Sequence, residues 1–361
     1  MGKEMCAVEG VERLMKELAF YSGKRVFVTG HTGFKGAWLC RILVNAGAQV
    51  TGYALPPSSE PNLYSLSGVE GDIRSIFGDI RDLNTLKTAF FEVRPEIVFH
   101  LAAQPIVRES YERPVYTYET NVMGTVNLLE CVRCCDSVRS VVNVTTDKVY
   151  RNHEWEWGYR ETDELCGFDP YSNSKSCSEL VTESYINSFL KAQGVAISTA
   201  RAGNVIGGGD FARDRIIPDC IRAVMDHKPI QVRNPYSIRP YQHVLEPLFA
   251  YLLIAQKQYE NPAFAGQYNV CPNEDDCIST GELVQIFCDA WGEGACWENA
   301  FSGGPHEANF LKLDCAKIKK VIGWQPRWSV REAVEQTCRW TKLFRDGGDL
   351  CAEMDREIIE V

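Results

Sequence analysis

The chain lacks the long apolar run that a membrane-spanning helix needs. Its longest strongly apolar stretch is 248–255, whereas a helix that crosses a bilayer needs roughly 20 such residues. Clustered lysine and arginine are also missing, and the net charge is −10. Nucleic acid and acidic membrane surfaces are therefore poor candidate partners. Residues 1–22 show no signal-peptide pattern, so we expect a cytoplasmic protein.

Spacings typical of metal ligands are missing as well. The chain has 6 histidines and 15 cysteines, but only Cys131, Cys134 and Cys135 cluster, without a second pair or a histidine partner. We therefore expect no metal site, and we interpret the cysteines as free thiols in a reducing compartment. The hydrophobic fraction of 45% and the charged fraction of 24% are ordinary for a globular enzyme.

The first half of the chain alternates two kinds of segment. Short runs rich in β-branched residues, such as 24–29 and 140–145, are separated by helical stretches such as 115–135 and 172–192. This alternation predicts βαβ units and a parallel sheet covered by helices on both faces. We expect an α/β fold of the Rossmann type, doubly wound, with a smaller, mixed α/β C-terminal lobe.

Composition also suggests where the parts of the chain begin and end. Glycine and proline break the sequence into short pieces after Arg201, but 245–256 has the spacing of one more sheet-covering helix. The expected parts are an N-terminal extension over 1–22, a main domain over 23–203 to which 244–270 return, and a lobe over 204–243 and 271–361.

A glycine-rich loop follows the first expected strand and opens a helix. It reads GHTGFKG, with glycines at its first, fourth and seventh positions. Such a loop lets the backbone approach a pyrophosphate, and the helix N-terminus adds free N–H groups and a positive dipole end. The residues expected to contact a dinucleotide here are Gly30, His31, Thr32, Gly33, Phe34, Lys35 and Gly36.

The spacing of this loop resembles that of the short-chain dehydrogenase/reductases. That resemblance implies further cofactor contacts after the third and fourth strands, at Asp79, Ile80, Leu101, Ala102 and Ala103. NAD enzymes often end the second strand with an acid for the ribose diol, but residues 50–55 contain none. The choice between NAD and NADP is therefore open at that position.

Tyr171 and Lys175 form a YxxxK motif at the start of an expected helix. Residues four apart share a helix face. An ammonium beside the phenol favours the phenolate, so we expect Lys175 to lower the pKa of Tyr171 toward neutrality. Tyr171 would then be a base that removes a hydroxyl proton while hydride leaves the same carbon.

Thr146, Asp147 and Lys148 end another expected strand. An acid beside a base at the mouth of a site suggests proton transfer beyond hydride transfer, which suits elimination of water. A solvated turn or a salt bridge is the competing interpretation of Asp147 and Lys148.

Together, GHTGFKG, Thr146 to Lys148 and Tyr171 to Lys175 resemble the nucleotide-sugar 4,6-dehydratases, and among them the CDP-glucose enzymes. The likeness extends from residue 23 to about 342 and includes 203–210, 214–218, 239–247 and 305–307. The resemblance implies C4 oxidation of a nucleotide-linked glucose by bound NAD, loss of water across C5 and C6, and return of the hydride to C6. The main domain would hold NAD, and the lobe would hold the nucleotide sugar.

The resemblance also implies roles for individual residues. Tyr171 would be the C4 base, Lys175 its partner and a cofactor ribose contact, and Thr146 the residue that orients the C4 oxygen. Asp147 would protonate the leaving C6 hydroxyl. Lys148 would remove the C5 proton as a neutral amine, or would stay charged and stabilise the enolate. Expected substrate contacts are Asn204, Arg215, Arg239 and His306.

Other functions stay open from the sequence. The nucleotide base is implied by the resemblance alone, and a C4 epimerase, a reductase or a non-catalytic cofactor-binding sensor would share the fold. We also expect a homodimer or homotetramer that pairs the helices 115–135 and 172–192 into a four-helix bundle, as such enzymes commonly do.

Overall fold

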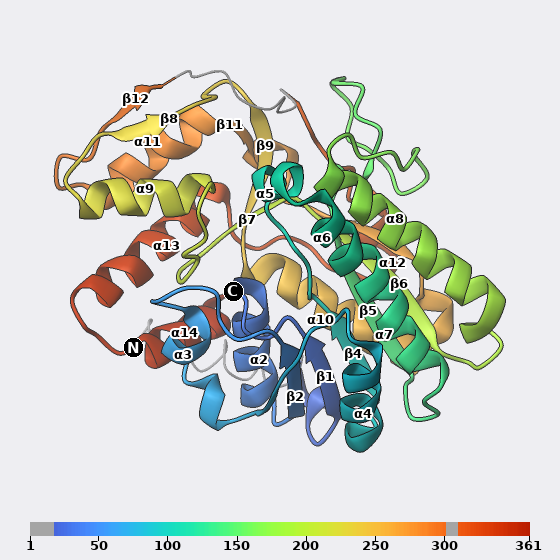
Figure 1. Cartoon of the computed structure of the whole chain (residues 1–361). Helices are drawn as coiled ribbons and strands as arrows, with labels where there is room; N and C mark the ends of the chain where they lie inside the picture. Colours follow the sequence, from blue (N-terminus) through green and yellow to red (C-terminus); the bar gives the residue numbers. More distant parts are fainter. Residues whose placement is uncertain (1–17, 301–309) are drawn as a thin grey trace.

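A seven-stranded parallel sheet forms the centre of the molecule (Figure 1). The computed structural model describes residues 18–300 and 310–361. In spatial order the strands are β10 (Gln267–Val270), β6 (Ala196–Ala202), β5 (Ser140–Thr146), β4 (Ile97–His100), β1 (Arg25–Thr29), β2 (Gln49–Ala54) and β3 (Arg74–Phe77). The strand order reverses between β1 and β4, which creates a crevice at their carboxyl ends. The predicted doubly wound Rossmann-type sheet is confirmed.

Helices cover both faces of this sheet, and each face has its own apolar core. One core includes residues of α2 (Phe34–Asn45) and α10 (Leu245–Glu260). The opposite core includes residues of α4 (Leu83–Val93) and α7 (Gly124–Arg133), and α8 (Pro170–Tyr185) packs beside α7. The strands β1, β4 and β5 are buried from end to end or nearly so, as expected for a parallel sheet between two helical layers.

Two smaller sheets lie outside the main one. The first has the order β11-β9-β7, and the second pairs β12 with β8. Their strands are β7 (Asn204–Ile206), β8 (Ile230–Val232), β9 (Ile238–His243), β11 (Cys277–Ser279) and β12 (Trp297–Asn299). The remaining helices are α3 (Leu63–Leu66), α5 (Val107–Glu112), α6 (Pro114–Tyr118), α9 (Ile216–Met225), α11 (Thr280–Trp291), α12 (Ala316–Val321), α13 (Val330–Arg345) and α14 (Leu350–Glu360).

Local sequence explains where the helix that bears the YxxxK motif begins. Asp169 is its N-cap and accepts a hydrogen bond from the Ser172 amide at 2.9 Å, and Pro170 occupies the first helical position. The helix predicted over 172–192 thus starts two residues earlier, and its last part is a π-helical segment over Ile186–Leu190. The helix predicted over 115–135 is likewise α6 and α7 joined by a π-helical segment.

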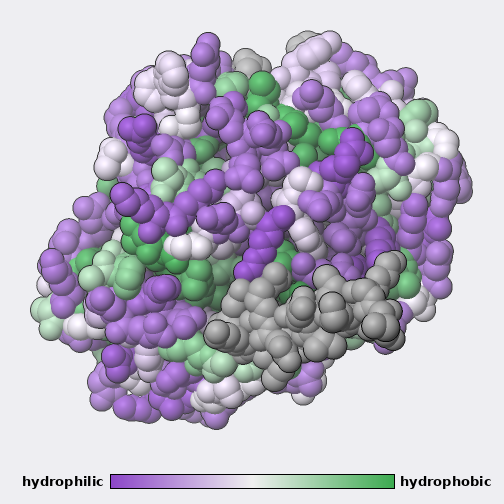
Figure 2. Space-filling model, turned by 180° about the vertical axis from the view of Figure 1, so that it is seen from behind, coloured by the Kyte–Doolittle hydropathy of each residue, from purple (hydrophilic) through white to green (hydrophobic). Residues whose placement is uncertain are grey.

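Figure 2 shows the face opposite to that of Figure 1, where hydrophilic residues dominate and apolar residues gather in separate patches. Among the described residues, no helix has the length and apolar character to cross a membrane.

The first glycine-rich turn packs closely on β2. The ring of His31 is fully buried and hydrogen bonds through Nε2 to the Ser75 hydroxyl at 2.6 Å. A Cβ at Gly52 would lie 2.2 Å from Cγ of that ring. Gly52 therefore leaves the space that the buried ring fills.

Gly52→Ala should destabilise the fold by about 1–3 kcal/mol, because overpacking a rigid buried site forces side chains or backbone to shift. Urea unfolding followed by circular dichroism measures the change. Gly71→Ala is the matched control, since a Cβ at Gly71 meets nothing within 4 Å. Equal stability of the two variants would contradict this account of the turn.

Candidate active site

A large cavity opens at the carboxyl ends of the central strands. Its volume is about 1610 Å³, more than the roughly 300–1,000 Å³ of a site for one small ligand. It reaches from the glycine-rich loop past β5 and α8 to β7 and β9. The space suits two ligands that meet end to end.

The glycine-rich loop forms a cradle at one end of the cavity. Gly30 has φ +76°, and a Cβ there would lie 2.8 Å from the Ala102 nitrogen. A Cβ at Gly36 would lie 2.1 Å from the Gly30 carbonyl oxygen. Gly33 is the N-cap of α2, so the free N–H groups of a twelve-residue helix open into this cradle.

The structure brings most of the predicted cofactor residues to this cavity. His31 is the exception, because its ring is buried against Gly52 and Ser75 and does not line the cavity. Burial lowers the pKa of His31 to about 4, so the ring is neutral at physiological pH. The predicted residues that do line it are Gly30, Thr32, Gly33, Phe34, Lys35, Gly36, Asp79, Ile80, Leu101, Ala102 and Ala103.

Tyr171 and Thr146 meet in the middle of the cavity. Tyr171 is 8% exposed, and its phenol interacts with the Thr146 hydroxyl, an interaction that favours the ionised phenol. Burial raises the pKa of Tyr171 to about 12, although Thr146 and the charge of Arg215 oppose the rise. The predicted lowering of this pKa by Lys175 is therefore absent from the arrangement of the chain's own residues.

Lys175 lies one helical turn beyond Tyr171 and is 5% exposed. Its Nζ donates a hydrogen bond to the Val144 carbonyl at 3.0 Å. Burial lowers the pKa of Lys175 to about 8, and the negative charge of Glu179 opposes that lowering. The ammonium is thus anchored to the strand that carries Thr146.

Asp147 and Lys148 begin a short 3₁₀ helix (Asp147–Val149) directly after β5. Asp147 is 1% exposed. Its Oδ1 accepts a hydrogen bond from Thr146 at 2.9 Å, whereas its Oδ2 is buried and has no hydrogen-bond partner among the described residues. Lys148 is half-buried and also lines the cavity. A buried carboxylate oxygen without a protein partner is an acid or base available to a ligand.

The predicted substrate residues on described elements line the far end of the cavity. Asn204 begins β7, Arg239 lies buried on β9, and Arg215 is the N-cap of α9. Arg215 also donates to the buried carboxylate of Asp210 at 2.9 Å. The prediction for His306 lies outside the described residues. Within those residues, no group of three or more metal-binding side chains is placed to hold an ion.

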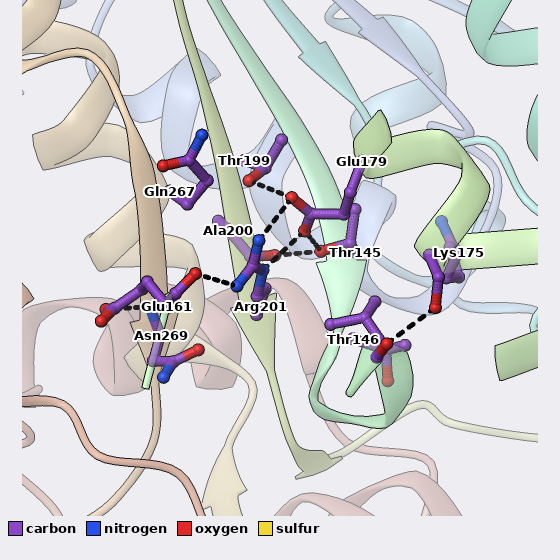
Figure 3. A network of polar contacts seen from close by, with 12 residues as sticks. Thr145, Thr146, Glu161, Lys175, Glu179, Thr199, Ala200, Arg201, Gln267 and Asn269 are labelled. Atoms are coloured by element: carbon purple, nitrogen blue, oxygen red, sulfur yellow. Dashed lines mark hydrogen bonds and ion pairs between the residues drawn. The ribbon is translucent and has the colours of Figure 1, made fainter. Parts of the chain in front are cut away.

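Glu179 of α8 and Arg201 of β6 were not predicted as part of the site. Glu179 is 3% exposed and forms a buried ion pair with Arg201 of β6 at 2.9 Å (Figure 3). The spacing contained a signal, since Tyr171, Lys175 and Glu179 follow one another at four-residue intervals and share a helix face.

The parallel sheet, the glycine cradle at its crevice and the Tyr–Lys pair on α8 define an extended short-chain dehydrogenase/reductase that acts on nucleotide sugars. The family profile described as GDP-mannose 4,6 dehydratase matches residues 27–337. The chain belongs to this family.

Two relatives with assigned functions are nucleotide-sugar 4,6-dehydratases. The chain is 48% identical over 345 residues to the CDP-glucose 4,6-dehydratase of Salmonella typhimurium, covering 94% of this chain and 96% of that protein. It is 26% identical over 348 residues to the dTDP-glucose 4,6-dehydratase of Haemophilus influenzae, covering 87% of this chain and 97% of that protein.

Solved structures share the fold. The Thermus thermophilus UDP-glucose 4-epimerase in complex with NAD has a TM-score of 0.76 at 25% identity, covering 88% of this chain and 98% of that one. The Bacillus anthracis dTDP-glucose 4,6-dehydratase in complex with NAD also has a TM-score of 0.76, at 20% identity, covering 90% and 98%.

Tyr171 should stay a neutral phenol in the protein without ligands, because its pKa is raised to about 12. The tyrosinate absorbance of the wild type minus that of Tyr171→Phe should therefore show no step up to about pH 10. Circular dichroism at each pH confirms that both proteins remain folded. A difference step near neutral pH would show that Lys175 alone lowers this pKa.

Proposed function

We propose that this chain is a CDP-glucose 4,6-dehydratase, which converts CDP-D-glucose to CDP-4-keto-6-deoxy-D-glucose and water. The observation that carries the proposal is Asp147, which lines the same cavity as Tyr171 and whose buried Oδ2 has no hydrogen-bond partner among the described residues. Its neighbour Lys148 lines the same wall. Hydride transfer alone does not need this second acid–base pair, whereas elimination does. The 48% identity to the Salmonella typhimurium enzyme supports the choice of CDP-glucose.

NAD fits the cradle that the loop 30–36 forms, because the free N–H groups at the start of α2 open into it and suit a pyrophosphate. Glycine at positions 30 and 36 allows the loop to fold this tightly, since a Cβ at either position would clash with backbone atoms. The chain would hold the dinucleotide with this loop, with Asp79 and Ile80 beyond β3, and with Lys175. Residues 53–60 line the cavity beyond β2, at the expected ribose end, and include no lysine or arginine for a 2′-phosphate. This favours NAD over NADP. When bound, NAD supplies the hydride acceptor for C4 and the hydride returned to C6.

Tyr171 removes the C4 hydroxyl proton, and Thr146 orients the C4 oxygen through its own hydroxyl. Lys175 stabilises the developing phenolate and reaches the cofactor ribose. The resulting C4 ketone acidifies the hydrogen on C5. Because the phenol lies in a buried site, this proton transfer is protected from bulk water.

Asp147 and Lys148 then carry out the elimination. Lys148 takes the proton from C5, and the electron pair forms the C5–C6 double bond as the C6–O bond breaks. Asp147 donates its proton to the departing hydroxyl, which leaves as water. The Lys148 side chain is half-buried and lines the cavity, so its amine can reach a sugar bound there.

The nucleotide end binds beyond the main sheet. Guanidinium groups match phosphate oxygens bidentately, so Arg215 and Arg239 contact the diphosphate, and Asn204 contacts the sugar or its phosphate. We assign dinucleotide binding to residues 23–203 with 244–270, which carry the large sheet. The parts 204–243 and 271–361, which carry the two small sheets, bind the nucleotide sugar.

Copies of the chain associate through α6 and α8 as a dimer or tetramer. Val115, Met123 and Leu180 are 69%, 50% and 52% exposed on this helical layer, which is more apolar surface than scattered residues supply. The reaction takes place in the cytoplasm. The cysteines of the described part of the chain are free, which suits a reducing compartment.

Incubation with CDP-glucose should give a product lighter by one water with no net NADH, because the hydride removed from C4 returns to C6. Mass spectrometry and NADH absorbance measure both, with and without added NAD. Water loss from dTDP-glucose or GDP-mannose but not CDP-glucose would refute the choice of nucleotide. A product of unchanged mass with an inverted C4 would indicate an epimerase.

Asp147→Asn should lower the rate of water loss by about 10²–10³ while C4 oxidation continues, because the amide cannot protonate the leaving hydroxyl. NADH should then accumulate to a level not seen in the wild type, measured by stopped-flow absorbance. The control is Asp136→Asn, the same substitution at a side chain that is 79% exposed on the surface. Normal water loss by Asp147→Asn would remove Asp147 from the mechanism.

A further inference from the structure

Glu179 lies on the catalytic face of α8, one turn beyond Lys175 and two beyond Tyr171. Its side chain does not line the cavity and points toward Thr145 of β5 and toward Thr199 and Arg201 of β6 (Figure 3). The residue is 3% exposed. A buried carboxylate is stable only when its charge and lone pairs are compensated.

Four hydrogen bonds supply that compensation. Oε1 accepts from the Thr145 hydroxyl at 2.5 Å and from Arg201 Nε at 2.9 Å. Oε2 accepts from the Thr199 hydroxyl at 2.6 Å and from Arg201 Nη2 at 3.0 Å. The pair is bidentate, and both members of it are 2% exposed in their side chains.

Arg201 extends this contact away from the helix. Its Nη1 donates to the Tyr150 hydroxyl at 2.7 Å and to the Glu161 carbonyl at 3.1 Å. Tyr150 in turn donates to Asn269 Oδ1 on β10 at 2.6 Å. The network therefore joins α8 to β5, β6 and β10, and to the segment directly after Lys148.

The contacts on β5 immediately precede the catalytic triplet. Lys175 Nζ donates to the Val144 carbonyl at 3.0 Å, and Thr145 donates to Glu179. Two successive residues of β5 are thus held by two successive turns of α8. The next residue, Thr146, reaches Tyr171.

We propose that Glu179, held by Arg201, is a positioning residue that fixes α8 against the end of β5 and supplies the negative charge that faces Lys175. The inference rests on the proposed function, in which Lys175 assists Tyr171. Glu179 touches neither ligand cavity nor reacting atoms, so it acts through Lys175 and Thr145.

The charges around Lys175 set the direction of the expected effect. Burial lowers the pKa of Lys175 to about 8, and Glu179 opposes this. The other titratable groups that face it are Tyr171 on α8, His100 on β4 and Lys35 on α2. His100 has a pKa lowered to about 3 and is neutral, so Glu179 is the negative charge that favours the ammonium. Its removal should lower the pKa of Lys175 further.

Glu179→Gln should therefore lower the pKa of Lys175 by about one unit. NMR titration of protein labelled with ¹³C at lysine Cε measures this pKa without turnover, and Lys175→Met assigns the signal. Glu183→Gln is the matched control, since Glu183 lies one turn further on α8 and is exposed. The pKa of Lys175 should not change in this control.

Glu179→Asp distinguishes charge from packing. It keeps the negative charge and should leave the pKa of Lys175 near the wild-type value even if kcat falls. In turnover measurements, the fall of kcat at alkaline pH should occur at lower pH in Glu179→Gln than in the wild type. In Glu179→Asp it should occur at the wild-type pH. A residue with a purely structural role would lower kcat in both without changing the pH of this fall.

Glu179→Gln leaves Arg201 buried without its partner, which can prevent folding. The double variant Glu179→Leu with Arg201→Met removes both charges together and should still lower the pKa of Lys175. An unchanged pKa in a folded variant overturns the inference. If wild type fails to dehydrate CDP-glucose while this pKa shifts, the proposed function fails and the positioning role stands.

Discussion

The contact between the end of β5 and α8 is the constraint on which the site depends. The residues proposed to hold or move protons come from both elements, 146–148 from β5 and its extension and 171–175 from α8. Polar contacts fix the two in register. Besides the contacts of Lys175 and Glu179, Asn143 donates to the hydroxyls of Ser178 and Thr182 at 3.0 and 2.9 Å. An apolar seam would tolerate sliding by a fraction of a turn, whereas buried hydrogen bonds lose their partners when it slides.

Three basic side chains, Lys35, Lys175 and Arg215, interact within the cavity although the chain as a whole carries a net charge of −10. Burial, together with the charges of Arg215 and Lys175, lowers the pKa of Lys35 to about 7. The place of Lys35 in the motif predicted a contact with the dinucleotide. Its Nζ lies 6.0 Å from the centre of the Tyr251 ring, and the charges of Arg215 and Lys175 act on it there. Amines crowded in this way gain from an anionic ligand, which relieves their mutual repulsion. A dinucleotide and a nucleotide diphosphate sugar both bring such charge.

Short-range patterns in the sequence were sufficient for the sheet, the glycine cradle and the YxxxK helix, because each is specified within a few residues. Contacts between strands were not accessible in this way. Arg201 lies beside Thr145 only because β5 and β6 pair in that register, and nothing near Arg201 in the sequence indicates Glu179. The side chain of His31 turns inward because Gly52, on the next strand, leaves space for it. The prediction for the pKa of Tyr171 was wrong, because the sequence shows its neighbour Lys175 but not how deeply the phenol is buried.

The raised pKa of Tyr171 links the two proton transfers of the proposed reaction. Burial is its main cause, and the negative charge of Asp147 adds to it. An ionised Asp147 therefore lowers the fraction of Tyr171 that is phenolate, the form that takes the C4 hydroxyl proton, and it also lacks the proton that the leaving hydroxyl needs. A protonated Asp147 removes that opposing charge and holds the proton for the second step. The protonated form of Asp147 thus serves both half-reactions of the proposed mechanism.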